Sequence, residues 1–364
     1  MGVNGMVVKN DSAPCNPERE KLSNYPLFDL LRFVLASIVV LGHAGFQFTE
    51  FLTGKLAVQV FFALSGWLIG GILIRTDRSE LPRFFFNRST RIWIPYALAV
   101  FLLYALAALR EGIDFFWFKY FILDVTFTHQ LFTFFPAAQA EMPLDGSGNQ
   151  FWSISVEEQF YLLAPLLMLF TSSGKSLWIW ATIALLAIAL NWNAAPIALG
   201  VCAAIIEART CFVQRGSTRI VAFTVAIVCA LGLTFLNIAS YIGPIFSVSV
   251  VLAVAMPGAR NRSALIAGGL SYPLYLNHYL GVFIVNFFSK RIIAIDQTSF
   301  VISQYVINIV LALGLYWLVD RQIQLHRNGW YSRKSGVALA LIAYALVTVG
   351  IVTGTLMQIY GPHR

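Results

Sequence analysis

Apolar stretches long enough to cross a lipid bilayer recur along the whole sequence, and no other feature restricts the fold so strongly. Of the 364 residues, 58% are hydrophobic and only 12% are charged, which is more apolar than a water-soluble fold requires. A helix of about 20 apolar residues spans the hydrocarbon core of a membrane. We therefore predict an all-α fold, a polytopic transmembrane helical bundle with ten or eleven spans. The predicted spans are residues 27–48, 56–74, 92–109, 151–171, 176–190, 194–208, 218–236, 240–256, 266–289, 299–319 and 336–358.

The distribution of Lys and Arg predicts which loops face the cytosol. With a cytosolic N-terminus, 18 of the 25 Lys and Arg residues lie in cytosolic segments, six lie in external segments and one, Arg32, lies inside the first span. Cytosolic loops of membrane proteins carry such an excess of positive charge. The same scatter of cations over short loops accounts for the net charge of +8 without a nucleic-acid partner.

The chain divides into three predicted regions. Residues 1–26 form a polar cytosolic tail, because they contain no apolar stretch that ends in a small-residue cleavage site, as a signal peptide would. Residues 27–335 form the transmembrane domain, and residues 336–364 add a further transmembrane helix and a short tail. The sequence stops soon after this helix, so we expect the membrane part to act without a following extracytoplasmic domain.

Arg32 and His43 are ionisable residues on one predicted membrane helix. They are 11 residues apart, so their side chains project within about 20° of each other and are separated by about 16 Å along the axis. Ionisable groups inside a membrane are costly and mark functional sites by default. With a cytosolic N-terminus, Arg32 lies near the inner end of the span and His43 near the outer end.

Glu157 is predicted to lie at the same depth as His43, about 8 Å below the outer boundary. A carboxylate that faces an imidazole fixes its tautomer and makes it a better general base. The alternative is that His43 is a satisfied interior histidine and that Glu157 or Glu158 only caps the fourth predicted helix near its N-terminus. The combination of the depth-matched pair with Arg32 favours a functional interpretation.

Two further groups allow both a functional and a structural interpretation. Gly66 and Gly70 have the GxxxG spacing of close helix packing, and the neighbouring Ser65 lies mid-membrane with no base evident in the sequence to activate it as a nucleophile. Arg88 and Arg91 are three residues apart before the third span. Their spacing favours two interpretations equally: they bind a phosphate-bearing cytosolic ligand, or they only set the orientation of the protein in the membrane.

The later part of the chain contains a proline in an apolar run. Pro273 is predicted to break or kink its helix and free backbone groups, which makes Asn277 and His278 candidates to line a cavity. The spacing of the histidines and of the four cysteines indicates no metal site, and we expect no disulfide.

Five sequence blocks, taken in order, resemble the acyltransferase-3 family of integral membrane acyltransferases. They are Arg32 with His43, Phe61-Phe62-x-x-Ser65-Gly66, Arg88-x-x-Arg91, the block from Trp152 to Tyr161 with Glu157 inside it, and Ser271-Tyr272-Pro273-Leu274-Tyr275-x-x-His278. The resemblance covers nearly the whole chain. Two departures from the family are noted. Asp320-Arg321-Gln322 stands in a region that often holds Glu-x-Pro, and we expect no extracytoplasmic hydrolase-like domain to follow the membrane part.

The resemblance implies a multi-pass enzyme of the bacterial inner membrane that takes an acyl group, usually acetyl, from cytosolic acyl-CoA. The acceptor would be a hydroxyl of a surface sugar or lipid-linked glycan, and no permanently bound cofactor is implied. By carry-over, His43 is the catalytic base, and Arg32, Arg88 and Arg91 handle the acyl donor. The depth match adds the expectation that Glu157 orients His43. Further residues are expected to line the cavity: Ser65, Trp152, Tyr161, Tyr275, Asn277 and His278.

Other mechanisms and classes stay open at this point. An acyl-enzyme on Ser65 is the less favoured route, and direct transfer from acyl-CoA is preferred. A transporter or flippase with the buried polar groups on its path is the main rival class. A non-catalytic membrane subunit ranks last.

Overall fold

Each predicted apolar stretch lies in a helix of its own. The computed structural model describes residues 25–133, 135, 138–236, 239–259, 262–291 and 296–362, and every regular element in this part is helical, so the all-α prediction is confirmed. The predicted tail lies outside the described residues, apart from its last two positions. The main helices are α2 (Pro26–His43), α3 (Gly54–Arg75), α4 (Leu81–Glu111), α8 (Trp152–Phe170), α9 (Leu177–Ala189), α10 (Ala195–Thr210), α11 (Gly216–Phe235), α12 (Ala239–Val254), α13 (Arg262–Arg291), α14 (Gln297–Leu315) and α16 (Arg333–Tyr360).

Seven helical segments of the described residues are long and apolar enough to cross a membrane. They are Pro26–His43, Gly54–Arg75, Arg78–Glu111, Asn149–Phe170, Gly216–Phe235, Gln297–Trp330 and Arg333–Tyr360. Helices α9 and α12 are apolar but shorter. The number of ten or eleven spans therefore stays a prediction, while the multi-pass character is supported.

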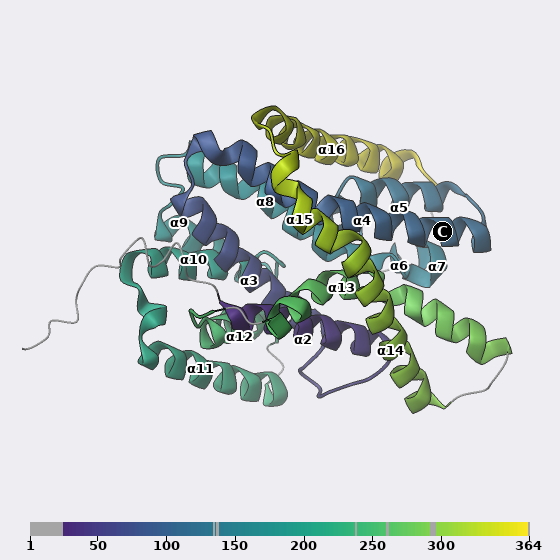
Figure 1. Ribbon diagram of the computed structural model, residues 1–364, viewed down its shortest axis with the longest axis horizontal. Coiled ribbons are helices and arrows are strands. Elements are labelled where there is room, and N and C mark those ends of the chain that lie inside the picture. Colours follow the sequence, from purple (N-terminus) through teal and green to yellow (C-terminus); the bar gives the residue numbers. More distant parts are fainter. Residues whose placement is uncertain are drawn as a thin grey trace, which may run out of the picture.

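The centre of the molecule is formed by α2, α3, α8, α10 and α13 (Figure 1). Helices α3 and α10 make the most extensive contact, because Gly66 lies against the backbone of Ile197 and Gly200 against that of Ala63. A side chain at either glycine would collide with the neighbouring main chain. Gly70 also lies close to α10, at Val201, so the prediction that Gly66 and Gly70 serve helix packing is confirmed.

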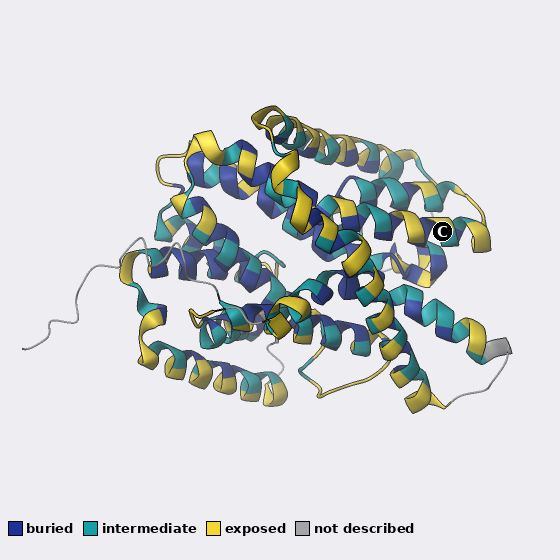
Figure 2. Cartoon of the chain, in the orientation of Figure 1, coloured by how far each residue is buried: buried dark blue, intermediate teal, exposed yellow. Residues whose placement is uncertain are grey.

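The periphery is built from helices that turn apolar side chains outward. Helices α11 and α16 lie at opposite borders of the molecule and carry rows of exposed residues (Figure 2). The exposed side chains of α11 include Ile220, Phe223 and Phe235, and those of α16 include Leu341. Apolar side chains are exposed in this way where a helix faces lipid.

Helix α13 continues through Pro273, so of the predicted break or kink the break is absent, and the kink stays a prediction. Proline removes one backbone donor, and polar side chains bond nearby carbonyl groups of the same helix. The hydroxyl of Ser271 donates to the carbonyl oxygen of Gly268 (2.7 Å), and Nδ2 of Asn277 donates to that of Pro273 (3.1 Å). The amide of Asn277, which was expected to face a cavity, thus bonds its own helix.

The stretch between α4 and α8 folds into short helices, α5 (Phe115–Val125), η2 (His129–Phe132), α6 (Ala138–Glu141), α7 (Pro143–Gly146) and η3 (Asn149–Phe151). Two buried polar pairs hold it. Nζ of Lys119 lies 2.8 Å from Oε2 of Glu141, and Nδ1 of His129 lies 2.6 Å from Oδ1 of Asp124. This segment packs against the N-terminal end of α8 and fixes where that helix begins.

A π-helical segment, Tyr316–Asp320, connects α14 to α15 (Arg321–Trp330). Such segments occur mostly as single turns inside α-helices, frequently at functional sites. Asp320, which the sequence comparison singled out as a departure, is its last residue and is buried.

The cysteines differ from expectation at one position. Cys211, which follows α10, is disulfide-bonded, so the prediction of no disulfide was wrong. Cys202 and Cys229 are free and buried.

Candidate active site

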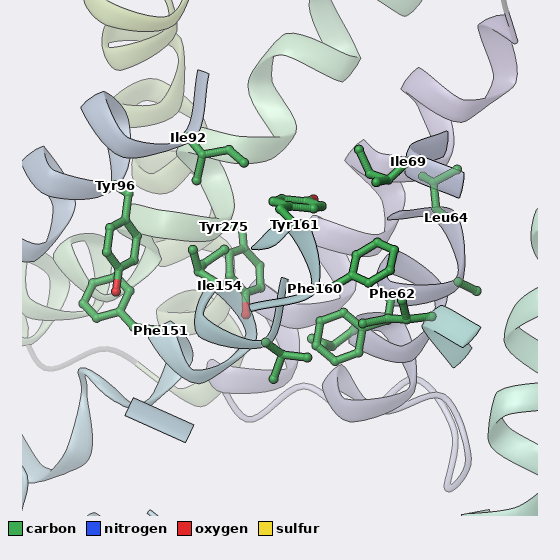
Figure 3. Packing of buried hydrophobic residues seen from close by; sticks show 14 of the residues in the cluster. Phe62, Leu64, Ile69, Ile92, Tyr96, Phe151, Ile154, Phe160, Tyr161 and Tyr275 are labelled. Carbon is green, nitrogen blue, oxygen red and sulfur yellow. The ribbon is translucent and has the colours of Figure 1, made fainter. Parts of the chain in front are cut away.

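A cavity of about 130 Å³ lies between α2, α3, α4, α8 and α13. It has room for several water molecules or a narrow ligand, since one water needs about 10–15 Å³. Its charged lining consists of Arg32, Arg88, Arg91 and Glu157. Its hydroxyl lining consists of Ser65, Ser153, Tyr161, Ser271, Tyr272 and Tyr275. Figure 3 shows the apolar part of this lining, with Phe62, Ile69, Ile92 and Ile154 around Tyr161 and Tyr275.

Glu157 is held inside the cavity by two hydroxyl groups. Oγ of Ser65 donates to Oε1 of Glu157 at 2.5 Å, and the hydroxyl of Tyr161 donates to Oε2 at 3.1 Å. The guanidinium of Arg88 lies over the ring of Tyr161, 5.6 Å from its centroid. The structure thus gives Ser65 a carboxylate partner that the sequence did not reveal.

Arg32 reaches the same cavity from α2. Its Nη1 atom lies 3.1 Å from Oδ1 of Asp29, one turn earlier on the helix. Asp29 is buried, so this ion pair holds the guanidinium against the cavity wall. The three arginines predicted to handle an acyl donor, Arg32, Arg88 and Arg91, therefore meet at one cavity.

A second pocket, which we call the basic pocket, lies next to the cavity and shares Arg88 and Arg91 with it. Its volume is about 300 Å³, and it lies between α3, the start of α4 and α15. The other polar residues that line it are Thr76, Glu80, Arg83, Asn87 and Arg327. Arg327 was missed by the sequence analysis. The only signal for it was a positive charge shortly after the tenth predicted span.

His43 lies at the end of α2, outside the lining of the cavity, and is exposed. Its Nδ1 atom lies 2.7 Å from Nε2 of His278, which is fully buried. The planes of the two rings are only 19° apart and their centroids are separated by 4.9 Å, which fits a hydrogen bond in the ring plane. The ring of Tyr279 lies 5.5 Å from that of His43.

The structure replaces the predicted pairing of His43 with Glu157. Glu157 bonds Ser65 and Tyr161, whereas His43 bonds His278. Similar predicted depth brought His43 and Glu157 together in the sequence analysis, but depth does not fix the direction in which a helix projects a side chain. The hydrogen-bond partner of His43 is therefore on α13, not on α8.

The expected cavity-lining residues fall into two groups. Ser65, Tyr161 and Tyr275 lie in the lining. Trp152, Asn277 and His278 are not part of it: the ring of Trp152 packs edge-on against Phe62 at 5.7 Å, Asn277 bonds its own helix, and His278 bonds His43. Among the described residues, no group of three His, Cys, Asp or Glu side chains is placed to hold a metal ion.

The long apolar helices are those of a multi-pass membrane protein, and comparison with known proteins shows that it is an acyltransferase. The model of the acyltransferase domain family Acyl_transf_3 matches residues 25–352, so the chain belongs to this family. It is similar to the peptidoglycan O-acetyltransferase OatA of Listeria monocytogenes, with 28% identity over 159 residues, which are 40% of this chain and 24% of the relative.

The O-acetyltransferase OatA of Staphylococcus aureus is 31% identical over 157 residues, which are 40% of this chain and 25% of the relative. The matched part thus spans about a quarter of the length of these relatives. No solved structure matches the chain.

Proposed function

We propose that this protein is an O-acyltransferase of the bacterial inner membrane that transfers an acyl group, most simply acetyl, from cytosolic acyl-CoA to a hydroxyl of a surface sugar or lipid-linked glycan. The observation that carries the proposal is the pair of adjoining hollows that share Arg88 and Arg91. The basic pocket is lined by four arginines, and the smaller cavity adds to Arg32, Arg88, Arg91 and Glu157 a larger number of hydroxyl and apolar groups. Acyl-CoA has two corresponding parts: a phosphate-bearing head that suits the basic pocket, and a slender thioester arm that suits the cavity.

The basic pocket suits the head of the donor. Guanidinium groups bind phosphate oxygens in bidentate fashion, and four arginines line this pocket: Arg83, Arg88, Arg91 and Arg327. The loop from α3 to α4 is cytosolic in the orientation that the positive charges predict, which is the side where acyl-CoA is available. Arg32 then lies one step further in, along the thioester arm.

His43 is the proposed general base at the outer end of α2. It takes the proton of the acceptor hydroxyl, whose oxygen forms a bond to the thioester carbonyl carbon. The carbon–sulfur bond then breaks, and the coenzyme A thiolate leaves and takes up the proton. The helix rise from Arg32 to His43, about 16 Å, is close to the reach of an acyl-pantetheine arm.

The proposal is tested by supplying acetyl-CoA labelled in the acetyl group to the full chain, purified and placed in lipid nanodiscs with a crude preparation of cell-surface glycan. We expect label in base-labile ester linkage to the glycan, and free coenzyme A in equal amount. A transporter or flippase would move the glycan or the label across sealed vesicles without forming an ester. That outcome would replace the proposal by the rival class.

A further inference from the structure

We propose that His278 is a positioning residue for His43, and that it fixes the tautomer in which Nε2 of His43 is the proton acceptor. The inference rests on the proposed function, in which His43 acts as the base. It adds to that function a residue from α13 and a defined proton position on each ring.

The hydrogen-bond partners determine these proton positions. Nδ1 of His278 lies 2.7 Å from the carbonyl oxygen of Tyr275, and a carbonyl can only accept, so this nitrogen carries a hydrogen. In the neutral ring, Nε2 of His278 then has a free lone pair. The short contact of 2.7 Å from this atom to Nδ1 of His43 needs a hydrogen between them, and His43 must supply it. Nε2 of His43 is left bare.

Burial makes this arrangement rigid. His278 is 0% exposed, and its ring is packed against Tyr279 at 4.6 Å between centroids. Tyr275 is held as well, since its hydroxyl lies 2.6 Å from Oγ of Ser153 and donates to the carbonyl oxygen of Gln150 at 3.1 Å. The carbonyl that fixes His278 therefore belongs to a residue that is anchored to α8 through its side chain.

The pair also suits the charge that forms during the reaction. When Nε2 of His43 takes the hydroxyl proton, the ring becomes an imidazolium, and its Nδ1–H points at the lone pair of His278. His278 thus has the function that a carboxylate has in other base–orienter pairs, without introducing a negative charge in the membrane. The fully buried ring of His278 bonds Nδ1 of His43, whereas the reactive nitrogen is Nε2. Of the two residues, only His43 is exposed.

The test compares two substitutions of nearly equal shape, His278→Gln and His278→Met. Gln offers a carbonyl oxygen near the position of Nε2, whereas Met offers no comparable acceptor. In the nanodisc assay we expect His278→Met to lower kcat by about 10²-fold or more, since a wrong tautomer of a catalytic histidine costs up to about 10⁴. We expect His278→Gln to keep within about tenfold of the wild type, with KM for acetyl-CoA unchanged in both.

A second measurement does not depend on activity. In the wild-type chain with ¹⁵N-labelled histidine, assigned by comparison with a His43→Gln variant, the chemical shifts report which ring nitrogens carry hydrogen. We expect Nδ1 of His43 protonated and Nε2 bare. A proton on Nε2 of the neutral His43 ring, or equal activity of the Gln and Met variants, overturns the positioning role. If the ¹⁵N shifts are as expected but the protein forms no ester, the proposed function is refuted and the tautomer assignment is not.

Discussion

The two ends of the candidate active site are built from different chemistry. At the inner end, Arg32, Arg88 and Arg91 surround a cavity whose carboxylate, Glu157, is bonded by hydroxyl groups. At the outer end, Nδ1 of His43 forms a hydrogen bond with Nε2 of His278. In the proposed function, anion binding takes place at the arginines of α2 and α4 and proton transfer at the other end of α2, so the two are expected to respond separately to mutation.

The largest effect is expected at the outer end. His43→Ala removes the proposed base, and we predict that acyl transfer falls by about 10² to 10⁴-fold or below detection. Membrane abundance should be unchanged, because His43 is an exposed residue at the end of α2. The measurement is ester formation per amount of protein in the membrane. An active His43→Ala variant would remove the proton-transfer function from this end.

The next effect is expected at the inner end and should alter the donor KM. Arg88→Ala removes a guanidinium that lines both hollows, and loss of one charge-assisted hydrogen bond of about 1.5–3 kcal/mol raises KM for acetyl-CoA about 10- to 100-fold. Initial rates over a range of acetyl-CoA concentrations check this. Arg215→Ala is the matched control, since Arg215 is exposed and lines neither hollow. A fall in kcat with unchanged KM would contradict the division of functions.

A smaller effect is expected for Ser65→Ala. Direct transfer needs no acyl-enzyme, so we predict a loss of about tenfold or less, caused by the removal of one hydrogen bond to Glu157. Mass spectrometry of the protein during turnover should show no acyl adduct on Ser65. A loss of activity comparable to that of His43→Ala, together with such an adduct, would establish the acyl-enzyme route and move the chemistry to the inner end.

The smallest effect concerns the N-terminal end of α14, whose residue Gln297 donates to the carbonyl oxygen of Ala44, next to His43. The hydroxyl and backbone N–H of Ser299 form hydrogen bonds that lower the pKa of Asp296, the N-cap of α14, below its ordinary value of 3.8. A carboxyl with a lowered folded pKa stabilises the protein above its unfolded pKa, and this stabilisation is lost as the pH falls through the folded value.

Asp296→Ala should therefore lower the unfolding temperature slightly at pH 7, and the difference should shrink below about pH 4. Thermal unfolding at both pH values is the measurement. Asp296→Asn, which can cap but cannot titrate, should show no such pH dependence. Neither variant should alter ester formation.

The sequence predicted the helices and the inner end better than the outer one. Long apolar stretches have no alternative to a helix in lipid, and Arg88 and Arg91 lie one turn apart, so their neighbourhood follows from local spacing. The partner of His43 depends on how α2 and α13 face each other across 235 positions of sequence. No local sequence pattern shows how these two helices are rotated relative to each other. The prediction therefore relied on depth in the membrane, and it chose Glu157 in place of His278.

The π-helical segment Tyr316–Asp320 has a consequence for the donor end. A π turn contains one residue more than an α turn, so everything beyond it is rotated by about 100° relative to an uninterrupted α-helix. Arg327 follows seven positions later and faces the basic pocket. The direction in which Arg327 projects thus depends on the extra residue of the π turn. Deleting one residue from that turn would rotate the Arg327 guanidinium away from the basic pocket, although no arginine would be lost from the sequence.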